Sequence, residues 1–385
     1  MAHSKNRRSF IKKSAVAGIA IPLFTSSLLA CNSKENSKKL KILILGGTSF
    51  LGPHQIAYAL KRGHSVSIFT RGKTKPTVHK ELFNQVEHLI GDRNNDLTAL
   101  EKDEWDLVID NSGRHAKWTK DTANLLKNRV TFYLYTSSTG VYYPYLGDNI
   151  TEDTKTLTKN PETYDNEYEK LEYSYGVMKT NSENETIKAF GKDRSIIVRP
   201  TYMFGPGDKT NRFIHWPIRL AKGGEVMVPG KKDDPVQYID VRDVAEFMIR
   251  LAEQKQAGTY NAVGPKEKQT MIEFVNEAKE TFNVNSTITN IDDYNFLEEK
   301  GISDLVPWIP LAGKNYGSSR VSNTKAISVG LTFRNLKKSI KDMHSWWYSN
   351  ALTNQYRAKY EANPKTILNT EKAILEKWKL YKQKK

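Results

Sequence analysis

The feature that most constrains the fold is an apolar run that leads into a glycine turn. Residues 41–45, KILIL, form a continuous apolar run of strand length, as expected for a strand buried on both faces of a parallel sheet. The turn GGTSFLG follows at 46–52, and residues 54–60, HQIAYAL, have the apolar periodicity of a helix. A strand, a glycine turn and a helix in this order are the context of a dinucleotide-binding fingerprint.

The glycine turn also predicts which groups contact a dinucleotide. Glycines let the backbone approach the pyrophosphate, which binds at the free N–H groups of the helix N-terminus. Ser49 replaces the middle glycine of the GxxGxxG pattern, so a side chain with a donor hydroxyl must be accommodated beside the phosphates. The contacts expected from this turn are Gly46, Thr48, Ser49, Phe50, Leu51 and Gly52.

Three more strand-like segments, at 65–72, 86–92 and 105–110, alternate with helical segments and favour a doubly wound parallel sheet. An acidic residue at the end of the second strand would accept the ribose hydroxyls of NAD, but Arg71 stands there and suits the 2′-phosphate of NADP. The alternative for Arg71 is a position that faces solvent. Cofactor contacts are also expected from residues at the ends of the third and fourth strands, Asp92, Asn111, Ser112 and Gly113.

A fifth strand-like segment beginning at 132 ends in hydroxyl side chains, among them Ser138. Tyr175 and Lys179 follow at i and i+4 on an expected helix, and therefore share one face. An ammonium beside a phenol lowers the pKa of the phenol and makes it a usable base near neutral pH. The hydroxyl of Ser138, opposite the face that carries Tyr175 and Lys179, would orient the carbinol or carbonyl oxygen of the substrate. These three residues predict acid–base chemistry on an alcohol or ketone.

Taken together, these motifs resemble the extended short-chain dehydrogenase/reductase family, which includes sugar-nucleotide epimerases and dehydratases. Three further segments are similar to motifs of that family: RPTYMFGPGD at 199–208, QYIDVRDVA at 237–245 and GTYNAVG at 258–264. The resemblance covers residues 40–345, and it implies a Rossmann-type α/β fold that binds NAD(P) and acts as an epimerase or dehydratase.

The resemblance also implies roles for single residues. Ser138 is expected to orient the substrate, Tyr175 to be the acid and base, and Lys179 to hold the nicotinamide ribose. Pro200 is expected at the cofactor. Hexose 4,6-dehydratases that resemble this family carry an Asp-Glu pair directly after the strand-five hydroxyl, whereas residues 139–140 are Thr-Gly here. Simple 4,6-dehydration is therefore disfavoured, and epimerases, with small residues there, fit better.

The expected substrate contacts are His115, Tyr142, Tyr202, Arg212 and Trp216. Tyr142 begins an aromatic run, 142–145, that forms either a platform for a sugar ring or a cover for a domain interface. Arg212 and Trp216 fall where the resemblance implies a substrate pocket. His115 is a candidate second acid or base, although a lone histidine is more often structural.

The N-terminus has the three-part order of a secretory signal. A basic NRRSFIKK segment at 6–13 precedes the apolar AVAGIAIPLF, and LLA stands directly before Cys31. Arg7 and Arg8 resemble the twin-arginine export signal, and LLAC resembles a bacterial lipobox. We therefore expect Cys31 to be lipidated and the protein to be a membrane-anchored periplasmic or cell-envelope lipoprotein. A chance basic and apolar N-terminus on a cytosolic enzyme is the weaker interpretation.

The composition bears on disulfides, metal sites and charged partners. Cys31 is the single cysteine, which excludes an internal disulfide framework and a cysteine-based metal cluster. The eight histidines show no HxH or HxxxH pairing, so no metal site is expected. The net charge of +16 suits attraction to anionic glycans, lipids or nucleic acid, but lysines spread over a solvated surface explain it more simply.

The expected organisation has five parts: an export signal with lipobox at 1–31, a polar tether at 32–39, a Rossmann domain at 40–200, a smaller α/β substrate-binding subdomain at 201–345 with some return to the sheet, and a helical extension at 346–385. The last segment is amphipathic and packs either on the body of the protein or on a partner. A homodimer is left open.

Export constrains the mechanism. No sustained nicotinamide pool exists outside the inner membrane, so an exported enzyme should hold NAD(P) tightly and restore its redox state in every turnover. Epimerisation through a keto intermediate does this, and a free sugar or glycoside fits this location better than a nucleotide sugar. The alternatives are an NADPH-dependent carbonyl reductase and a non-catalytic cofactor-binding or nucleic-acid-binding module. Ser138, Tyr175, Lys179 and the export signal speak against nucleic acid.

Overall fold

The apolar run at 41–45 is the first strand of a parallel sheet in the computed structural model, which describes residues 39–111 and 114–385. The predicted export signal with Cys31, nearly all of the predicted tether, and the turn residues Ser112 and Gly113 lie outside the described residues. Within the described ranges, no helix combines the length and the apolar character needed to cross a membrane.

The sheet has seven parallel strands in the order β10-β6-β5-β4-β1-β2-β3. Their bounds are β1 Lys41–Leu45, β2 Ser65–Thr70, β3 Glu87–Ile90, β4 Trp105–Asp110, β5 Val130–Thr136, β6 Ser195–Pro200 and β10 Gly258–Ala262. The strands after β1 are added on one side of it as far as β3 and on its other side from β4 onward, so the strand order reverses between β1 and β4. Open α/β sheets bind ligands at such a switch point, beyond the carboxyl ends of the strands. The predicted Rossmann-type doubly wound sheet is confirmed.

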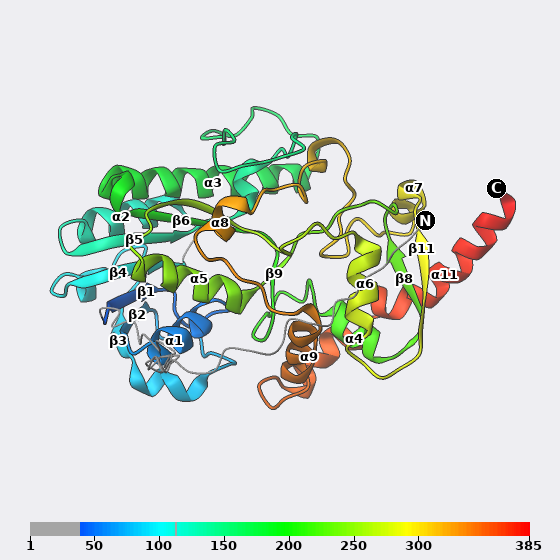
Figure 1. Cartoon of the computed structure of the whole chain (residues 1–385), viewed down its shortest axis with the longest axis horizontal. Coiled ribbons are helices and arrows are strands. Elements are labelled where there is room, and N and C mark those ends of the chain that lie inside the picture. The colour runs from blue at the N-terminus through cyan, green and yellow to red at the C-terminus, as the bar shows by residue number, and fades with distance from the viewer. Residues whose placement is uncertain (1–38, 112–113) are drawn as a thin grey trace, which may run out of the picture. The chain divides into compact units, whose positions relative to one another are not determined.

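Helices cover both faces of this sheet (Figure 1). Helices α1 (Gly52–Lys61) and α5 (Val241–Glu253) pack together on one face, and α2 (Ala116–Leu126) packs with α3 (Glu167–Phe190) on the other. Along β1, Ile42 and Ile44 belong to the core beneath α1 and α5, whereas Leu43 and Leu45 belong to the core beneath α2. This alternation explains why every position of the strand after Lys41 is apolar.

Residues beyond β6 build most of a second lobe with its own core. Its strands are β7 (Met203–Phe204) paired with β9 (Ile239–Asp240), and β8 (Gly224–Pro229) paired with β11 (Ser286–Ile291). Its helices are α4 (His215–Ala221), α6 (Met271–Lys279), α7 (Tyr294–Glu299) and α9 (Leu336–Trp347), while α8 (Thr324–Ser328) lies against β10. Trp216, Trp308 and Trp347 are fully buried in this core.

The C-terminal extension forms α10 (Asn354–Glu361) and α11 (Ile367–Lys384). Helix α11 packs on the body of the chain, against α4 and β8. Its apolar side chains Ile374, Leu375 and Trp378 belong to the core of the second lobe. The buried carboxylate of Glu371 forms an ion pair with Arg219 of α4. The extension is therefore an integral part of that lobe.

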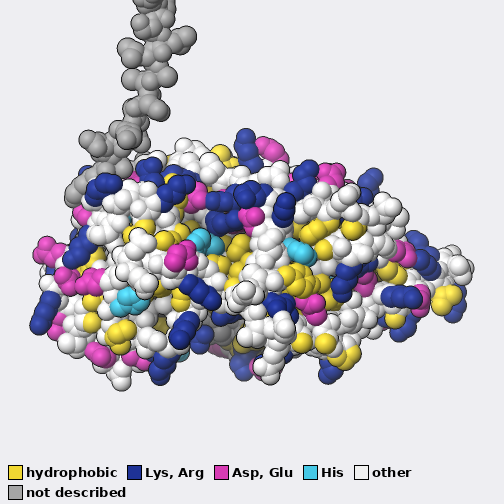
Figure 2. All heavy atoms as spheres, turned by 90° about the horizontal axis from the view of Figure 1, so that it is seen from below, with side chains coloured by type: hydrophobic (Ala, Val, Ile, Leu, Met, Phe, Trp, Pro, Cys, Tyr) yellow, Lys and Arg dark blue, Asp and Glu magenta, His cyan; other side chains and the backbone are white. Residues whose placement is uncertain are grey.

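Short 3-10 turns connect several of these elements: η1 (Lys80–Gln85), η2 (Thr98–Leu100), η3 (Thr139–Tyr142), η4 (Lys192–Arg194) and η5 (Gly313–Asn315). Figure 2 shows Lys and Arg side chains spread over one face of the molecule, with Asp and Glu side chains between them. The basic charge on this face is therefore distributed.

Candidate functional site

The glycine turn between β1 and α1 is shaped by close backbone packing. A Cβ atom at residue 52 would lie 2.3 Å from the carbonyl oxygen of Gly47, and one at residue 47 would lie 2.7 Å from Cγ2 of Ile68. Glycine is therefore required at both positions. Ser49, by contrast, is exposed in the cleft above the turn, which explains why a side chain replaces the middle glycine.

A cavity of about 360 Å³ lies beyond the carboxyl ends of β1, β2, β3 and β4. The predicted cofactor residues that line it are Gly46, Thr48, Ser49, Arg71, Asp92 and Asn111. Asn111 is fixed there because its amide donates to Gln55 Oε1 at 2.7 Å and its Oδ1 accepts from Thr136 Oγ1 at 2.8 Å. The cleft has the position, the close-packed glycines and the polar groups that a bound dinucleotide requires.

The other predicted cofactor residues lie around this cleft. Phe50 lines an adjoining cavity of about 210 Å³, formed with residues 74–78 and 207–210. Leu51 is buried in the core and acts in packing. Gly52 begins α1. Pro200, at the end of β6, lines the neighbouring catalytic cavity together with Ser138.

The predicted catalytic residues are brought together by β5, η3 and α3. Ser138 follows β5, and its Oγ accepts a hydrogen bond from the N–H of Gly140 at 3.0 Å. The Lys179 ammonium is buried, donates to the carbonyl oxygen of Thr136 at 2.7 Å, and lies 5.9 Å from the centre of the Tyr175 ring. Burial works to lower the pKa of Lys179, but interactions with Tyr135 and Tyr175 raise it overall.

These residues open onto one cavity of about 440 Å³. Ser138 and Tyr175 form part of its wall, and Tyr175 is 42% exposed. The predicted substrate residues Tyr202 and Arg212 line the same cavity. The Arg212 guanidinium lies 5.5 Å from the centre of the Tyr202 ring. A phenol, a serine hydroxyl and a guanidinium therefore face a space large enough for a sugar ring.

The other three predicted substrate residues do not line this cavity, and the burial of Tyr142 and Trp216 corrects the expectation that these two contact substrate. Tyr142 is buried, and its hydroxyl bonds to Asn261 and to Arg199, each at 2.7 Å, so it belongs to a buried polar network. Trp216 is buried in the second lobe and donates to the carbonyl oxygen of Val306 at 2.7 Å. His115 precedes α2 on the surface and packs edge-on against Trp118.

Sequence reasoning missed two other groups in this region. Arg93 is buried and forms a bidentate ion pair with Asp110, with both N–O distances at 2.9 Å. Glu172, on α3, lines the catalytic cavity. Its spacing from Tyr175 on the same helix was the available signal, because residues three apart are neighbours on a helix surface.

Gly140 is a point of close approach to the catalytic ring. A Cβ atom there would lie 2.9 Å from Cε1 of Tyr175. We expect Gly140→Ala to push the ring aside and to reduce turnover by about a hundredfold, because small displacements of reacting groups are costly. Gly147→Ala is the control, since its added Cβ would meet only Ile150 at an ordinary 3.5 Å. Equal turnover in the two variants would contradict the expected role of the contact.

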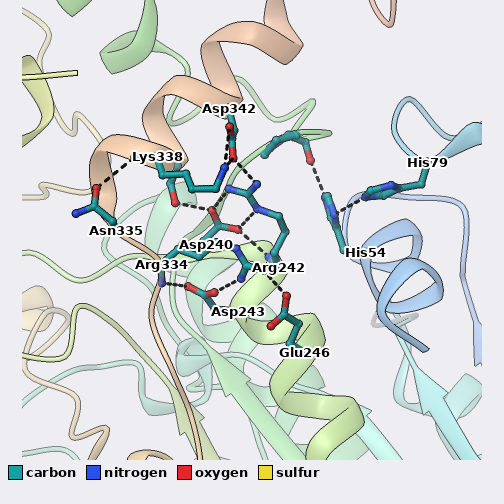
Figure 3. A network of polar contacts seen from close by, with 12 residues as sticks. His54, His79, Asp240, Arg242, Asp243, Glu246, Arg334, Asn335, Lys338 and Asp342 are labelled. Carbon is teal, nitrogen blue, oxygen red and sulfur yellow. Dashed lines mark hydrogen bonds and ion pairs between the residues drawn. The ribbon is translucent and has the colours of Figure 1, made fainter. Parts of the chain in front are cut away.

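His54, at the start of α1, links the glycine turn to two loops (Figure 3). Its Nε2–H donates to the carbonyl oxygen of Pro206 at 2.8 Å, so its Nδ1 accepts from Nε2–H of His79 at 3.3 Å. A ring that donates from Nε2 and accepts at Nδ1 is a neutral imidazole. Burial lowers the pKa of His54 to about 4, which favours the same state.

A second network in Figure 3 ties α5 to α9. Arg242 pairs with Asp240 and Asp342, each at 2.6 Å, and Arg334 pairs with Asp243 and Glu246. Burial raises the pKa of Asp243 to about 6. Because α5 covers the sheet and α9 belongs to the second lobe, these ion pairs connect the Rossmann sheet to the second lobe.

Acidification is expected to destabilise the fold because His54 and His215 are buried as neutral rings. Burial lowers the pKa of His54 to about 4 and that of His215 to about 3, both from 6.5. Below pH 6.5 the unfolded chain therefore binds more protons, and the free energy of unfolding falls as pH drops through this window, by on the order of 3 kcal/mol for each ring. Urea titrations between pH 7 and pH 4 measure this loss.

The control for the acid effect is His215→Phe. Neither ring nitrogen of His215 has a hydrogen-bond partner among the described residues, and the ring contacts Trp216 edge-on. Phenylalanine keeps that contact and removes the titratable group, so the variant should lose stability less steeply with pH. An unchanged slope would show that His215 does not contribute.

The fold and the site define a class of protein: a doubly wound α/β chain with a dinucleotide cleft, a cavity lined by Ser138 and Tyr175, and a buried Lys179 beside the Tyr175 ring. The model of the NAD dependent epimerase/dehydratase family matches residues 42–263, more than half of the chain. The chain belongs to this family, which confirms the predicted resemblance and the predicted class of enzyme. Across residues 39–111 and 114–385, no group of three or more His, Cys, Asp or Glu side chains is arranged to hold a metal ion.

One curated relative is the chloroplast stem-loop binding protein of 41 kDa b from Arabidopsis thaliana, 29% identical over 252 residues. The match covers 60% of each protein, so the chain spans about three fifths of that relative's length. Solved structures resemble the fold at lower identity. WbmH of Bordetella bronchiseptica, solved with NAD+, has a TM-score of 0.59 at 15% identity and covers 82% of this chain and 100% of its own.

Two more solved structures share this architecture. WbmG of Bordetella bronchiseptica, in complex with NAD and UDP, has a TM-score of 0.58 at 17% identity and covers 83% of this chain and 98% of its own. The UDP-glucuronic acid 4-epimerase from Bacillus cereus, in complex with NAD, has a TM-score of 0.57 at 16% identity and covers 82% of this chain and 99% of its own.

Proposed function

We propose that this protein is an exported lipoprotein enzyme that epimerises a sugar or glycoside through a transient ketone and keeps its dinucleotide bound throughout. One observation carries the proposal: Ser138 and Tyr175 line the same cavity, and the buried ammonium of Lys179 lies beside the Tyr175 ring. The dinucleotide cleft lies at the adjoining strand ends. Membership in an NAD-dependent epimerase/dehydratase family supports the same chemistry.

Each residue has a defined task in this mechanism. A dinucleotide held in the cleft by the glycine turn and Asn111 would supply reversible hydride transfer at the carbinol carbon. Tyr175 takes the proton of the substrate hydroxyl and gives it back to the same oxygen. Ser138 holds that oxygen by a hydrogen bond, and Lys179, anchored on Thr136, supports the negative charge of a Tyr175 phenolate. Arg212 and Tyr202 contact the rest of the ring.

The competing substrate class is a nucleotide sugar, because the named structural relatives include a UDP-glucuronic acid 4-epimerase and a complex that contains UDP. The predicted export signal favours an unactivated sugar, since nucleotide sugars are cytoplasmic. A different function, nucleic-acid binding, is suggested by the name of the chloroplast relative and by the net charge of +16. The acid–base residues facing one cavity favour catalysis instead.

The test begins with the full-length protein purified from a bacterial host. Mass spectrometry should detect NAD(P) that survives gel filtration, and a screen of free sugars, methyl glycosides and UDP-sugars should yield an epimerised product without net cofactor turnover. Protein that is free of dinucleotide and consumes added NADPH stoichiometrically would establish a reductase instead. Cys31→Ser should move the protein from the membrane fraction to the soluble fraction if Cys31 is lipidated.

We also propose that the cofactor is NADP. Three basic side chains, Arg71, Lys73 and Arg114, line the cleft beyond β2 and β4, where an adenosine ribose would lie. We expect Arg71→Ala to weaken NADP binding by about ten- to a hundredfold, because a charged hydrogen bond to phosphate contributes about 1.5–3 kcal/mol, and to leave NAD binding unchanged. Lys232→Ala, on an exposed loop, is the control. Equal weakening of both cofactors would contradict the preference.

A further inference from the structure

Helix α3 places three side chains in the catalytic cavity. Tyr168, Glu172 and Tyr175 stand at i, i+4 and i+7 of this helix, so they form one stripe on its surface. All three line the cavity that contains Ser138. A substrate that reaches Tyr175 therefore also lies beside the carboxylate of Glu172.

Glu172 is chemically distinct within this cavity. It is the one carboxylate among the described residues that line it. Its side chain makes no hydrogen bond or ion pair with another described residue, and the nearest opposite charge that acts on it is Arg212. Glu169, one turn earlier, is different: it is buried, pairs with Lys314 and accepts from the N–H of Asp165 at 2.9 Å. Glu172 is therefore available to substrate.

Glu172 differs in its protonation behaviour from the tyrosines that line the same cavity. Burial raises the pKa of Tyr202 to about 12 and also raises that of Tyr145 and Tyr168, so these phenols stay neutral at physiological pH and act as donors. Burial raises the pKa of Glu172 as well, and Arg212 opposes this rise. A carboxylate with a raised pKa is a stronger base than an exposed one.

The segment at the end of β5 supplies no second carboxylate to this cavity. Its lining residues Ser138 and Thr139 carry hydroxyls and Gly140 has no side chain. Gly140 also approaches the Tyr175 ring, since an added Cβ would lie 2.9 Å from Cε1.

We propose that Glu172 is a second proton-transfer residue, which removes the hydrogen from the carbon next to the transient ketone of the substrate. The inference rests on the proposed function, because the ketone forms when the bound nicotinamide dinucleotide oxidises the substrate. The C–H bond then breaks, the proton goes to the Glu172 carboxylate, and the electron pair forms an enolate. Its oxygen accepts hydrogen bonds from the hydroxyls of Tyr175 and Ser138. Return of the proton from Glu172 to the carbon restores the ketone.

The remaining cavity wall fits a polyhydroxylated ring. Asn315 Oδ1 and Ser318 Oγ line the cavity, are buried, and have no hydrogen-bond partner among the described residues. Both lie on the loop that contains η5, beyond the family match that ends at residue 263. Buried polar atoms normally find a partner, and substrate hydroxyls would provide one here. The substrate class is accordingly a sugar with a hydroxyl-bearing carbon next to the oxidised one.

The test uses the holoenzyme with its dinucleotide in D2O and a panel of methyl glycosides of glucose, galactose and mannose. Nicotinamide absorbance reports the oxidation, and NMR reports deuterium at the neighbouring carbon. We expect both in the wild type. Glu172→Gln should still reduce the cofactor but lose exchange by about a hundredfold, and Tyr175→Phe should lose both. Glu167→Gln, on the same helix with its side chain 84% exposed, is the control.

The outcomes separate the two proposals. Cofactor reduction without deuterium exchange in the wild type overturns the role of Glu172, as does exchange in Glu172→Gln at the wild-type rate. Failure of every glycoside to reduce the bound cofactor overturns the proposed function, and the role of Glu172 falls with it. Two further results would distinguish proton transfer from a packing role. Glu172→Asp should partly restore the rate of deuterium exchange, and the pH profile of exchange in Glu172→Gln should lack the ionisation of the carboxyl group.

Discussion

Replacing Tyr175 by phenylalanine is expected to lower turnover by about a hundredfold or more while the dinucleotide stays bound. The ring rests against Gly140, and phenylalanine can occupy the same space without its hydroxyl. The substrate oxygen then loses the group that exchanges its proton, while the glycine turn and the cleft beyond β4 are untouched. Turnover of the sugar identified by the screen and mass spectrometry of the bound cofactor measure the two parts of the result.

The matched control for this variant is Tyr173→Phe. Tyr173 lies on the same helix, but it is buried in a separate aromatic cluster and does not line the cavity. We expect only a small change in turnover from its loss. If Tyr175→Phe retained full activity, Tyr175 would not be the acid and base, and the assignment of Ser138 and Lys179 as its partners would also fail.

Replacing Glu371 by alanine is expected to lower the free energy of unfolding by about 3–5 kcal/mol, because it leaves a buried guanidinium without its counter-charge. Glu371, on α11, pairs with Arg219 of α4, and its Oε1 accepts from the N–H of Met227 at 2.9 Å. All of these groups are buried. Urea unfolding at neutral pH measures the loss.

The control for this substitution is Glu376→Ala, on the exposed side of the same helix. It removes the same atoms without breaking a buried pair, so its effect should stay within about 0.5 kcal/mol. Equal losses in the two variants would show that helix propensity rather than the ion pair is responsible. A large loss confined to Glu371→Ala would establish that the C-terminal extension stabilises the second lobe.

The local elements of the cofactor site were predictable because short stretches of sequence encode them. A buried strand needs an uninterrupted apolar run, and Gly47 and Gly52 are required by contacts within a few ångströms. The pairing of Tyr175 with Lys179 follows from helical spacing alone. Arg71 and Asn111 were placed correctly at the cleft because the ends of parallel strands meet at one edge of the sheet.

The substrate wall was harder to predict because it depends on how distant segments pack. Tyr142 is next to the catalytic segment in sequence, yet the buried Arg199 and Asn261 turn its hydroxyl into the core. Trp216 lies four residues from Arg212, but only Arg212 faces the cavity. Asn315 and Ser318 come from a loop with no recognisable motif.

The sequence by itself determined the sheet, the glycine turn and the Tyr-Lys pair, because periodicity and backbone sterics act over a few residues. Only the tertiary structure decided that Glu172 shares the cavity with Tyr175 and Ser138, that Gly140 approaches the Tyr175 ring, and that α11 completes the second lobe. Burial and the approach of segments far apart in the chain create these environments, and no single stretch of sequence contains them.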